Sequence, residues 1–87
     1  MKKEELDKKV RDCGDAVITY KSPNSRKTKY NVCTVDFDVP YIQNKKNRAK
    51  EDESTVLMFC WDTDSFRLMK AENVTSVVPL SNILRNK

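Results

Sequence analysis

The sequence predicts a single mainly β (α+β) domain, in which a short N-terminal helix precedes a small five-stranded barrel. Its 87 residues are enough for one small domain and no second one. Apolar residues follow a helical spacing at the start of the chain and alternate with a period of two from Ala16 onward. Five segments of this second kind are separated by turns or loops, which is typical of a closed or nearly closed barrel.

Residues 1–13 are expected to form the N-terminal helix. Leu6 and Val10 lie four positions apart and share one helix face, while charged residues of both signs surround them. Gly14 follows, and glycine readily adopts the positive φ that ends a helix. Such a helix either caps the open end of the barrel or frays as a tail.

The first two strands are predicted over residues 16–21 and 27–37, which are rich in β-branched and aromatic side chains. The segment Ser22-Pro23-Asn24-Ser25 between them is a turn signal. The alternation of apolar residues changes parity between Val32 and Cys33. A bulge at that point would keep both halves of the strand facing the core.

A long polar loop is expected over residues 38–54, and loops of this length in compact domains are usually functional or mobile. The next strand, residues 55–61, is apolar at nearly every position, as in a strand covered on both faces. Two short strands follow over residues 65–70 and 74–78, and residues 80–84 are expected to form one turn of helix.

These elements place the barrel at residues 16–80 and a C-terminal tail at residues 81–87. A small barrel of five short strands with a helix in front is expected to be SH3-like or Sm-like.

Composition argues against an enzyme. The chain has no His and one Gly, which excludes Ser-His-Asp and Cys-His catalysis, His-ligated zinc and glycine-rich phosphate loops. Cys13, Cys33 and Cys60 form no CxxC pair and are expected to be reduced thiols. Acidic pairs that could indicate a metal site lie where turns are expected and lack the pattern of a calcium loop: Asp36 and Asp38, and Asp62 and Asp64. No metal and no cofactor are predicted.

The expected location is the cytoplasm, or the cytoplasm of the host cell for a viral protein. No run of apolar residues approaches the length of about 20 that a membrane helix requires. The first residues, Met1 to Glu5, are charged and do not resemble a signal peptide.

Several motifs of the predicted barrel resemble WYL-type domains. The segments that carry the resemblance are Trp61 to Leu68 and Asn73 to Val77, with Ile18 to Lys21, Arg26 to Thr28 and Asn31 to Thr34 as a first hairpin. The chain is similar to the compact WYL-like Sm/SH3-type barrels of tailed phages over roughly residues 16–80. The Trp-Tyr-Leu tripeptide itself is absent, and no helix-turn-helix precedes the barrel. The resemblance implies a phage-encoded barrel that binds nucleic acid or a nucleotide-type ligand in a regulatory role.

Arg67 is the leading candidate for a ligand contact. It matches the ligand-contacting Arg of WYL-type barrels, and its five donors suit phosphate or carboxylate. In the alternative interpretation it points outward and pairs with Asp62 or Asp64. Trp61, at a strand end beside a polar turn, is the aromatic residue most expected to be partly exposed and to stack on a base.

Two basic loops could form one patch that attracts phosphates. Their residues are Lys21, Arg26, Lys27 and Lys29 in the first, and Lys45, Lys46, Arg48 and Lys50 in the second. The alternative is a pair of ordinary solvated turns.

A second functional hypothesis is a protein-interaction module that binds and modulates a host protein of transcription or defence, with homo-oligomerisation also open. The apolar third strand, an open barrel edge, and Val39, Tyr41 and Ile42 in the long loop would then carry the contact, by strand addition or loop docking.

Overall fold

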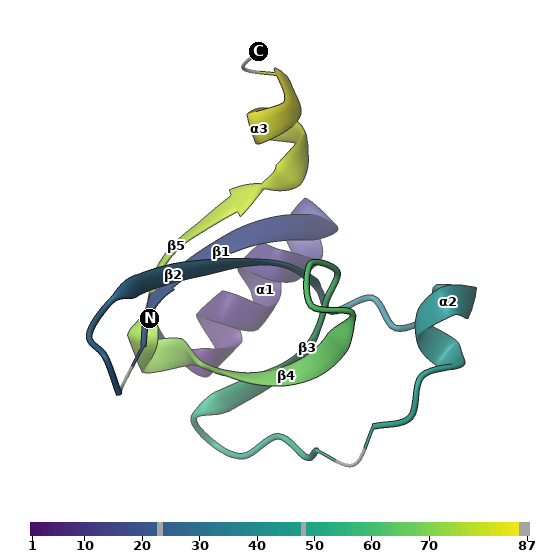
Figure 1. The fold of residues 1–87 in the computed structure, drawn as a ribbon, viewed down its shortest axis with the longest axis horizontal. Helices are drawn as coiled ribbons and strands as arrows, with labels where there is room; N and C mark the ends of the chain where they lie inside the picture. Colours follow the sequence, from purple (N-terminus) through teal and green to yellow (C-terminus); the bar gives the residue numbers. More distant parts are fainter. Residues whose placement is uncertain (23, 48, 86–87) are drawn as a thin grey trace.

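The computed structural model describes the chain except residues 23, 48, 86 and 87 (Figure 1). Its elements, in chain order, are α1 (Lys3–Cys13), β1 (Asp15–Lys21), β2 (Thr28–Thr34), α2 (Pro40–Gln43), β3 (Thr55–Cys60), β4 (Ser65–Lys70), η1 (Ala71–Asn73), β5 (Val74–Pro79) and α3 (Leu80–Arg85). The predicted helix, the five strands and the C-terminal turn of helix are all present. Helix α2, which lies within the long loop, was not predicted.

The five strands form one antiparallel sheet in the order β4-β3-β2-β1-β5. The small, mainly β α+β fold predicted from the sequence is therefore confirmed. The sheet curls around α1, which Figure 1 shows between the β3–β4 arm and the β1–β2–β5 arm. Strands β4 and β5 are the two edges, and the described residues form no ladder between them.

Helix α1 covers the inner face of this sheet. Leu6 and Val10 are fully buried, and they pack with inward-facing strand residues such as Ala16, Ile18 and Met58. Gly14 ends the helix at a φ of 76°, a conformation that costs glycine little. The helix is therefore part of the core and does not fray.

The bulge predicted between Val32 and Cys33 is absent. Strands β1 and β2 pair without a register shift from Asp15 opposite Thr34 to Lys21 opposite Thr28. Val32 faces outward and is only half-buried, so no bulge is needed to turn it inward. Strand β2 also ends at Thr34 rather than at residue 37. A register shift does occur between β1 and β5: Thr19 pairs with Ser76 and Tyr20 with Val74, so Thr75 is an extra residue in β5.

A second, aromatic cluster covers the outer face of β3 and β4. Phe59 is fully buried and makes edge-to-face contacts with Tyr41, Trp61 and Phe66, at ring-centroid distances of 6.2, 5.1 and 5.3 Å. Tyr41 belongs to α2, so the long loop folds back onto the sheet. Strand β3 is covered on both faces, as its apolar sequence predicted.

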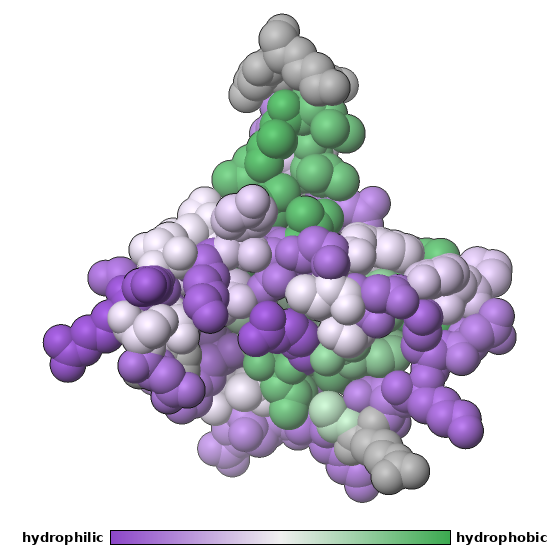
Figure 2. Space-filling view, in the orientation of Figure 1, coloured by the Kyte–Doolittle hydropathy of each residue, from purple (hydrophilic) through white to green (hydrophobic). Residues whose placement is uncertain are grey.

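The C-terminal end of the chain stands apart from this body. In Figure 1, α3 extends beyond the end of β5, which itself pairs with β1 along its length, and Figure 2 shows hydrophobic side chains on this extension. None of the helices in the described residues has the length and apolar character that crossing a membrane requires.

Candidate nucleic-acid interface

The turn between β1 and β2 carries the first basic loop. Lys21 ends β1, Lys29 lies in β2, and Arg26 and Lys27 occupy the turn between them. All four are exposed, and within the described part of the chain none forms an ion pair. We call these four residues the basic hairpin; their charge is available to a ligand.

Backbone hydrogen bonds fix the shape of this turn. The Ser22 N–H donates to the Lys27 carbonyl and the Arg26 N–H donates to the Ser22 carbonyl, both at 2.9 Å. Arg26 has a φ of 56°, which is unfavourable for a residue with a β-carbon. Because the turn contains no glycine, a charged residue takes the left-handed position at its tip.

Arg67 lies in β4 on the inner face of the sheet. It pairs with the buried Met58 in the β3–β4 ladder, and directly opposed residues share a face. Its guanidinium donates to the Tyr20 hydroxyl and to Asn31 Oδ1, both at 3.3 Å, and lies 5.9 Å from the centre of the Tyr20 ring. These partners are neutral, so they hold the guanidinium in place without cancelling its charge.

Asn31 is the centre of this polar group. Its side chain is almost fully buried, and every polar atom of it has a partner, as burial requires. Oδ1 accepts from the Tyr20 hydroxyl at 2.5 Å, and Nδ2 donates to Asp62 Oδ2 at 3.0 Å. The amide stands between Asp62 and Arg67. The predicted alternative, a direct ion pair of Arg67 with Asp62 or Asp64, does not occur in the described residues.

Lys29 of the basic hairpin and Arg67 share one face of the sheet, whereas Lys21 points to the other face at the end of β1. Tyr20 pairs with Lys29 in the β1–β2 ladder, so these two side chains and Arg67 share the inner face of the sheet. A cavity of about 260 Å³ opens beside Arg67 at the β4 edge. It is lined by Tyr20, Thr55, Arg67, Leu68, Met69, Lys70 and Asn73.

The second basic loop lies elsewhere, so the structure corrects the prediction of a single patch. Figure 1 places α2 and the start of the loop that follows it on the opposite side of the molecule from the β1–β2 turn, and the loop then runs back beneath the sheet to β3. Lys45 pairs with Asp64 at 3.0 Å and sits over the Tyr41 ring, and Lys46 follows it on the same surface. The hydrogen bond that the Lys45 ammonium donates to the Asp64 carboxylate raises the pKa of Lys45. Arg48 lies outside the described residues.

Trp61 does not join Arg67. It is half-buried, but its ring packs against Phe59 and stacks on Tyr41, on the outer face of the sheet. Its indole N–H donates to Asp15 Oδ1 at 2.9 Å. The structure thus corrects its place in a shared site with Arg67. Tyr30, exposed by 69%, is adjacent to Lys29 in β2, but it pairs with Thr19 and therefore points to the other face of the sheet.

The residues expected to contact a protein partner serve the fold instead. Ile42 is 1% exposed and fills the space under the loop, so it cannot contact a partner in this conformation. Val39 is half-buried and begins α2. Tyr41 is half-exposed, but its hydroxyl donates to Asp64 Oδ1 at 2.6 Å. The loop is therefore held against the rest of the fold and does not offer these three side chains to a partner.

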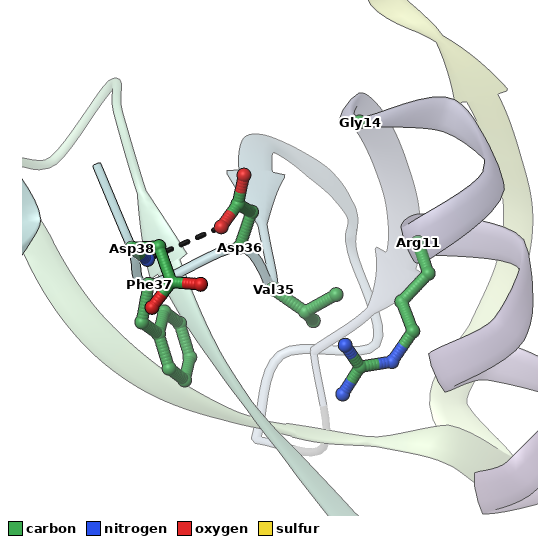
Figure 3. Close-up of a pocket in the computed structure, with 6 residues that line it drawn as sticks. All are labelled: Arg11, Gly14, Val35, Asp36, Phe37 and Asp38. Carbon is green, nitrogen blue, oxygen red and sulfur yellow. Dashed lines mark hydrogen bonds between the residues drawn. The ribbon is translucent and has the colours of Figure 1, made fainter.

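Another hollow of the described surface lies beside the segment that follows β2 (Figure 3). It measures about 470 Å³, and Arg11 faces Asp36 and Asp38 across it. Arg11 already pairs with Asp7 at 3.0 Å, and Asp36 Oδ1 accepts the Asp38 N–H at 3.1 Å. The two acids therefore stabilise a turn. Across the described residues, no group of three or more His, Cys, Asp or Glu side chains is arranged to hold a metal ion.

The three cysteines are free thiols in the structure. Cys33 and Cys60 are fully buried and paired across β2 and β3, with their sulfur atoms 2.9 Å apart. The hydrogen bond with Cys60, together with burial, raises the pKa of the Cys33 thiol. This pair lies in the core beneath Asn31 and Arg67.

Tyr20 and Asn31 are the residues of the site that sequence reasoning missed. The available signal was Asn31 itself, a polar residue that shares strand parity with the buried Cys33. A buried amide in a strand must find partners, but the sequence does not reveal which side chains supply them.

No protein-family model, curated protein or solved structure matches this chain.

Proposed function

We propose that this chain is a non-enzymatic binding protein that holds a nucleic acid, through its phosphate groups, on the basic hairpin and Arg67. The proposal rests on one observation: none of these five cations is paired with a carboxylate in the described residues. The basic hairpin makes no ion pair in the described residues, and Arg67 is held by a hydroxyl and an amide oxygen rather than by a carboxylate. Phosphate groups attract cations that are uncompensated in this way.

The position of Arg67 adds to this support. A guanidinium that is already held by two hydrogen bonds loses less conformational entropy on binding than a free one. It retains donors beyond the one that contacts Tyr20 and Asn31, and these can bind phosphate oxygens. The cavity beside it is smaller than a typical small-molecule site. Its size suits a single base of a bound strand.

Tyr30 supplies the aromatic component. Its ring is exposed by 69% and lies on the outer face of β2, because Tyr30 pairs with Thr19, whereas Lys29 and Arg67 lie on the inner face. A bound strand would have to pass around the hairpin to reach both the cations and this ring. Stacking on such a ring tolerates any base. Sequence-tolerant binding of a single strand by charge and stacking is therefore the mode that we propose.

The resemblance to the WYL-like barrels of tailed phages also supports the binding of nucleic acid. It is carried by the residues around Trp61 to Leu68, and it aligns Arg67 with the ligand-contacting Arg of those barrels. We infer from it a phage-encoded protein with a regulatory role. Binding of nucleic acid or of a nucleotide-type ligand is the activity expected of such a protein.

Fluorescence anisotropy with a labelled single-stranded oligonucleotide tests the proposal. We expect Lys27→Gln combined with Lys29→Gln to weaken binding at low salt by at least about tenfold, because two phosphate contacts are lost. Lys45→Gln combined with Lys46→Gln is the matched control, since it removes the same charge from the other loop. Equal losses in both double variants would contradict the proposed site. The absence of binding by the unmodified protein at about 50 mM salt would contradict the function.

A further inference from the structure

The end of β5 and helix α3 present an apolar surface that no described residue covers. Ile83 is exposed by 46% and Leu84 by 59%. With Leu80 they lie at spacings of three and four, so they share one face of α3. Figure 2 shows this surface rising from the body of the molecule. We call residues 77–84 the C-terminal projection.

Charge is absent from this part of the chain. Residues 73–84 contain no charged side chain, although 34% of all residues in the chain are charged. Exposed apolar surface without charge marks interaction sites in soluble proteins. The apolar face formed by Leu80, Ile83 and Leu84 can therefore meet a second copy without a charge inside the contact, while Arg85, the last residue of α3, directly follows this face in the chain.

The projection continues onto the sheet. Val78 pairs with Val17, and Val17 pairs with Val32, which forms a row of valines across β5, β1 and β2. All three are half-buried and face away from α1. Strand β5 is also an edge of the sheet, with its second side unpaired in the described residues. An edge strand exposes unpaired backbone N–H and C=O groups, which proteins usually protect from pairing with other chains.

The chain as a whole exposes more surface than a compact monomer of its mass, and this excess belongs to the whole surface rather than to the C-terminal projection alone. The chain exposes 6170 Å² at a mass of 10.1 kDa. A compact monomer of that mass is expected to expose about 5,300 Å². The excess is close to the roughly 800 Å² that each partner buries in a standard interface.

We propose that two copies of this chain form a two-fold symmetric dimer through the C-terminal projection, with the α3 helices packed face to face. In such an interface the same patch meets itself. Ala16 pairs with Pro79 and Tyr20 with Val74, so α3 and the basic hairpin lie at opposite ends of β1. Both hairpins of the dimer therefore remain free. The proposal does not depend on the proposed function.

Sedimentation equilibrium of nuclease-treated protein tests the dimer. The unmodified chain is expected to sediment at about twice 10.1 kDa in the micromolar range. Ile83→Lys combined with Leu84→Lys removes two anchors from each copy and should weaken association by at least about 100-fold. Both positions are exposed, so the far-UV circular dichroism spectrum should stay unchanged and confirm that the variant folds.

Leu68→Lys is the matched control, because Leu68 is exposed by 41% on the other edge strand. It should leave the dimer intact. A monomer at about 100 µM would overturn the proposal. So would association that is lost after nuclease treatment, or that Leu68→Lys disrupts while the α3 variant does not.

Discussion

Replacing Phe59 with alanine tests whether the long loop is a packed part of the fold. Phe59 is fully buried, and its ring centroid lies 5.1 to 6.2 Å from those of Trp61, Phe66 and Tyr41. Truncation of a buried Phe costs about 3–5 kcal/mol, which includes the cavity that it leaves. Each lost edge-to-face contact accounts for roughly 0.5–1.5 kcal/mol beyond burial. We therefore expect the free energy of unfolding to fall by about 4 kcal/mol.

Urea unfolding followed by circular dichroism measures this loss. With a typical urea dependence of about 2 kcal/mol per M, the midpoint should fall by about 2 M. Tyr30→Ala is the control, because the Tyr30 ring is exposed by 69% and its loss should change stability by less than about 0.5 kcal/mol. A loss below about 1.5 kcal/mol for Phe59→Ala would refute the packing of α2 against β3.

Three further predictions concern reactivity, pH and backbone strain. In the folded protein a thiol reagent should modify the partly exposed Cys13 and spare the two buried thiols, whereas modification of all three at one rate would contradict the described core. The hydrogen bonds from Tyr41 and Lys45 lower the pKa of Asp64. The stability that these hydrogen bonds contribute is present above the ordinary pKa of 3.8 and is lost as pH falls through the lowered pKa. The free energy of unfolding of Asp64→Asn, measured with urea at several pH values, should therefore depend less on pH in acid than that of the unmodified chain. The same pH dependence in both proteins would contradict these hydrogen bonds. Arg26→Gly should relieve the left-handed turn and raise stability by up to about 1 kcal/mol in thermal unfolding, and a clear loss would argue against that turn.

Local pattern was sufficient to predict most of the fold. The change of period at Ala16 and the apolar strand 55–60 indicated the helix and a strand covered on both sides, and the structure contains both. The bulge at Val32 was wrong because parity was taken to mean that every apolar residue is buried. Val32 faces outward, and its place in the row of valines depends on strand pairing that a single segment does not reveal.

The candidate site was predictable only in part. The charges of the basic hairpin are evident in the sequence, as is Arg67. Their proximity depends on the tertiary fold: Tyr20 pairs with Lys29 in the β1–β2 ladder, and the curled sheet brings Arg67 of β4 to the Tyr20 hydroxyl. The same dependence on tertiary structure explains the errors at Ile42 and Trp61. From the sequence, an apolar residue in a polar loop or at a strand end is expected to be free to contact a partner or a ligand, and only the folded structure shows that it packs against other residues.

The salt dependence of oligonucleotide binding tests the central claim most directly. Five cations, the basic hairpin and Arg67, predict a slope of log affinity against log salt of about −3.5 for a single strand. Affinity should then fall about 100-fold between 50 and 200 mM salt, and Arg67→Gln should reduce the slope by about 0.7. Affinity that stays unchanged over this range would contradict the account.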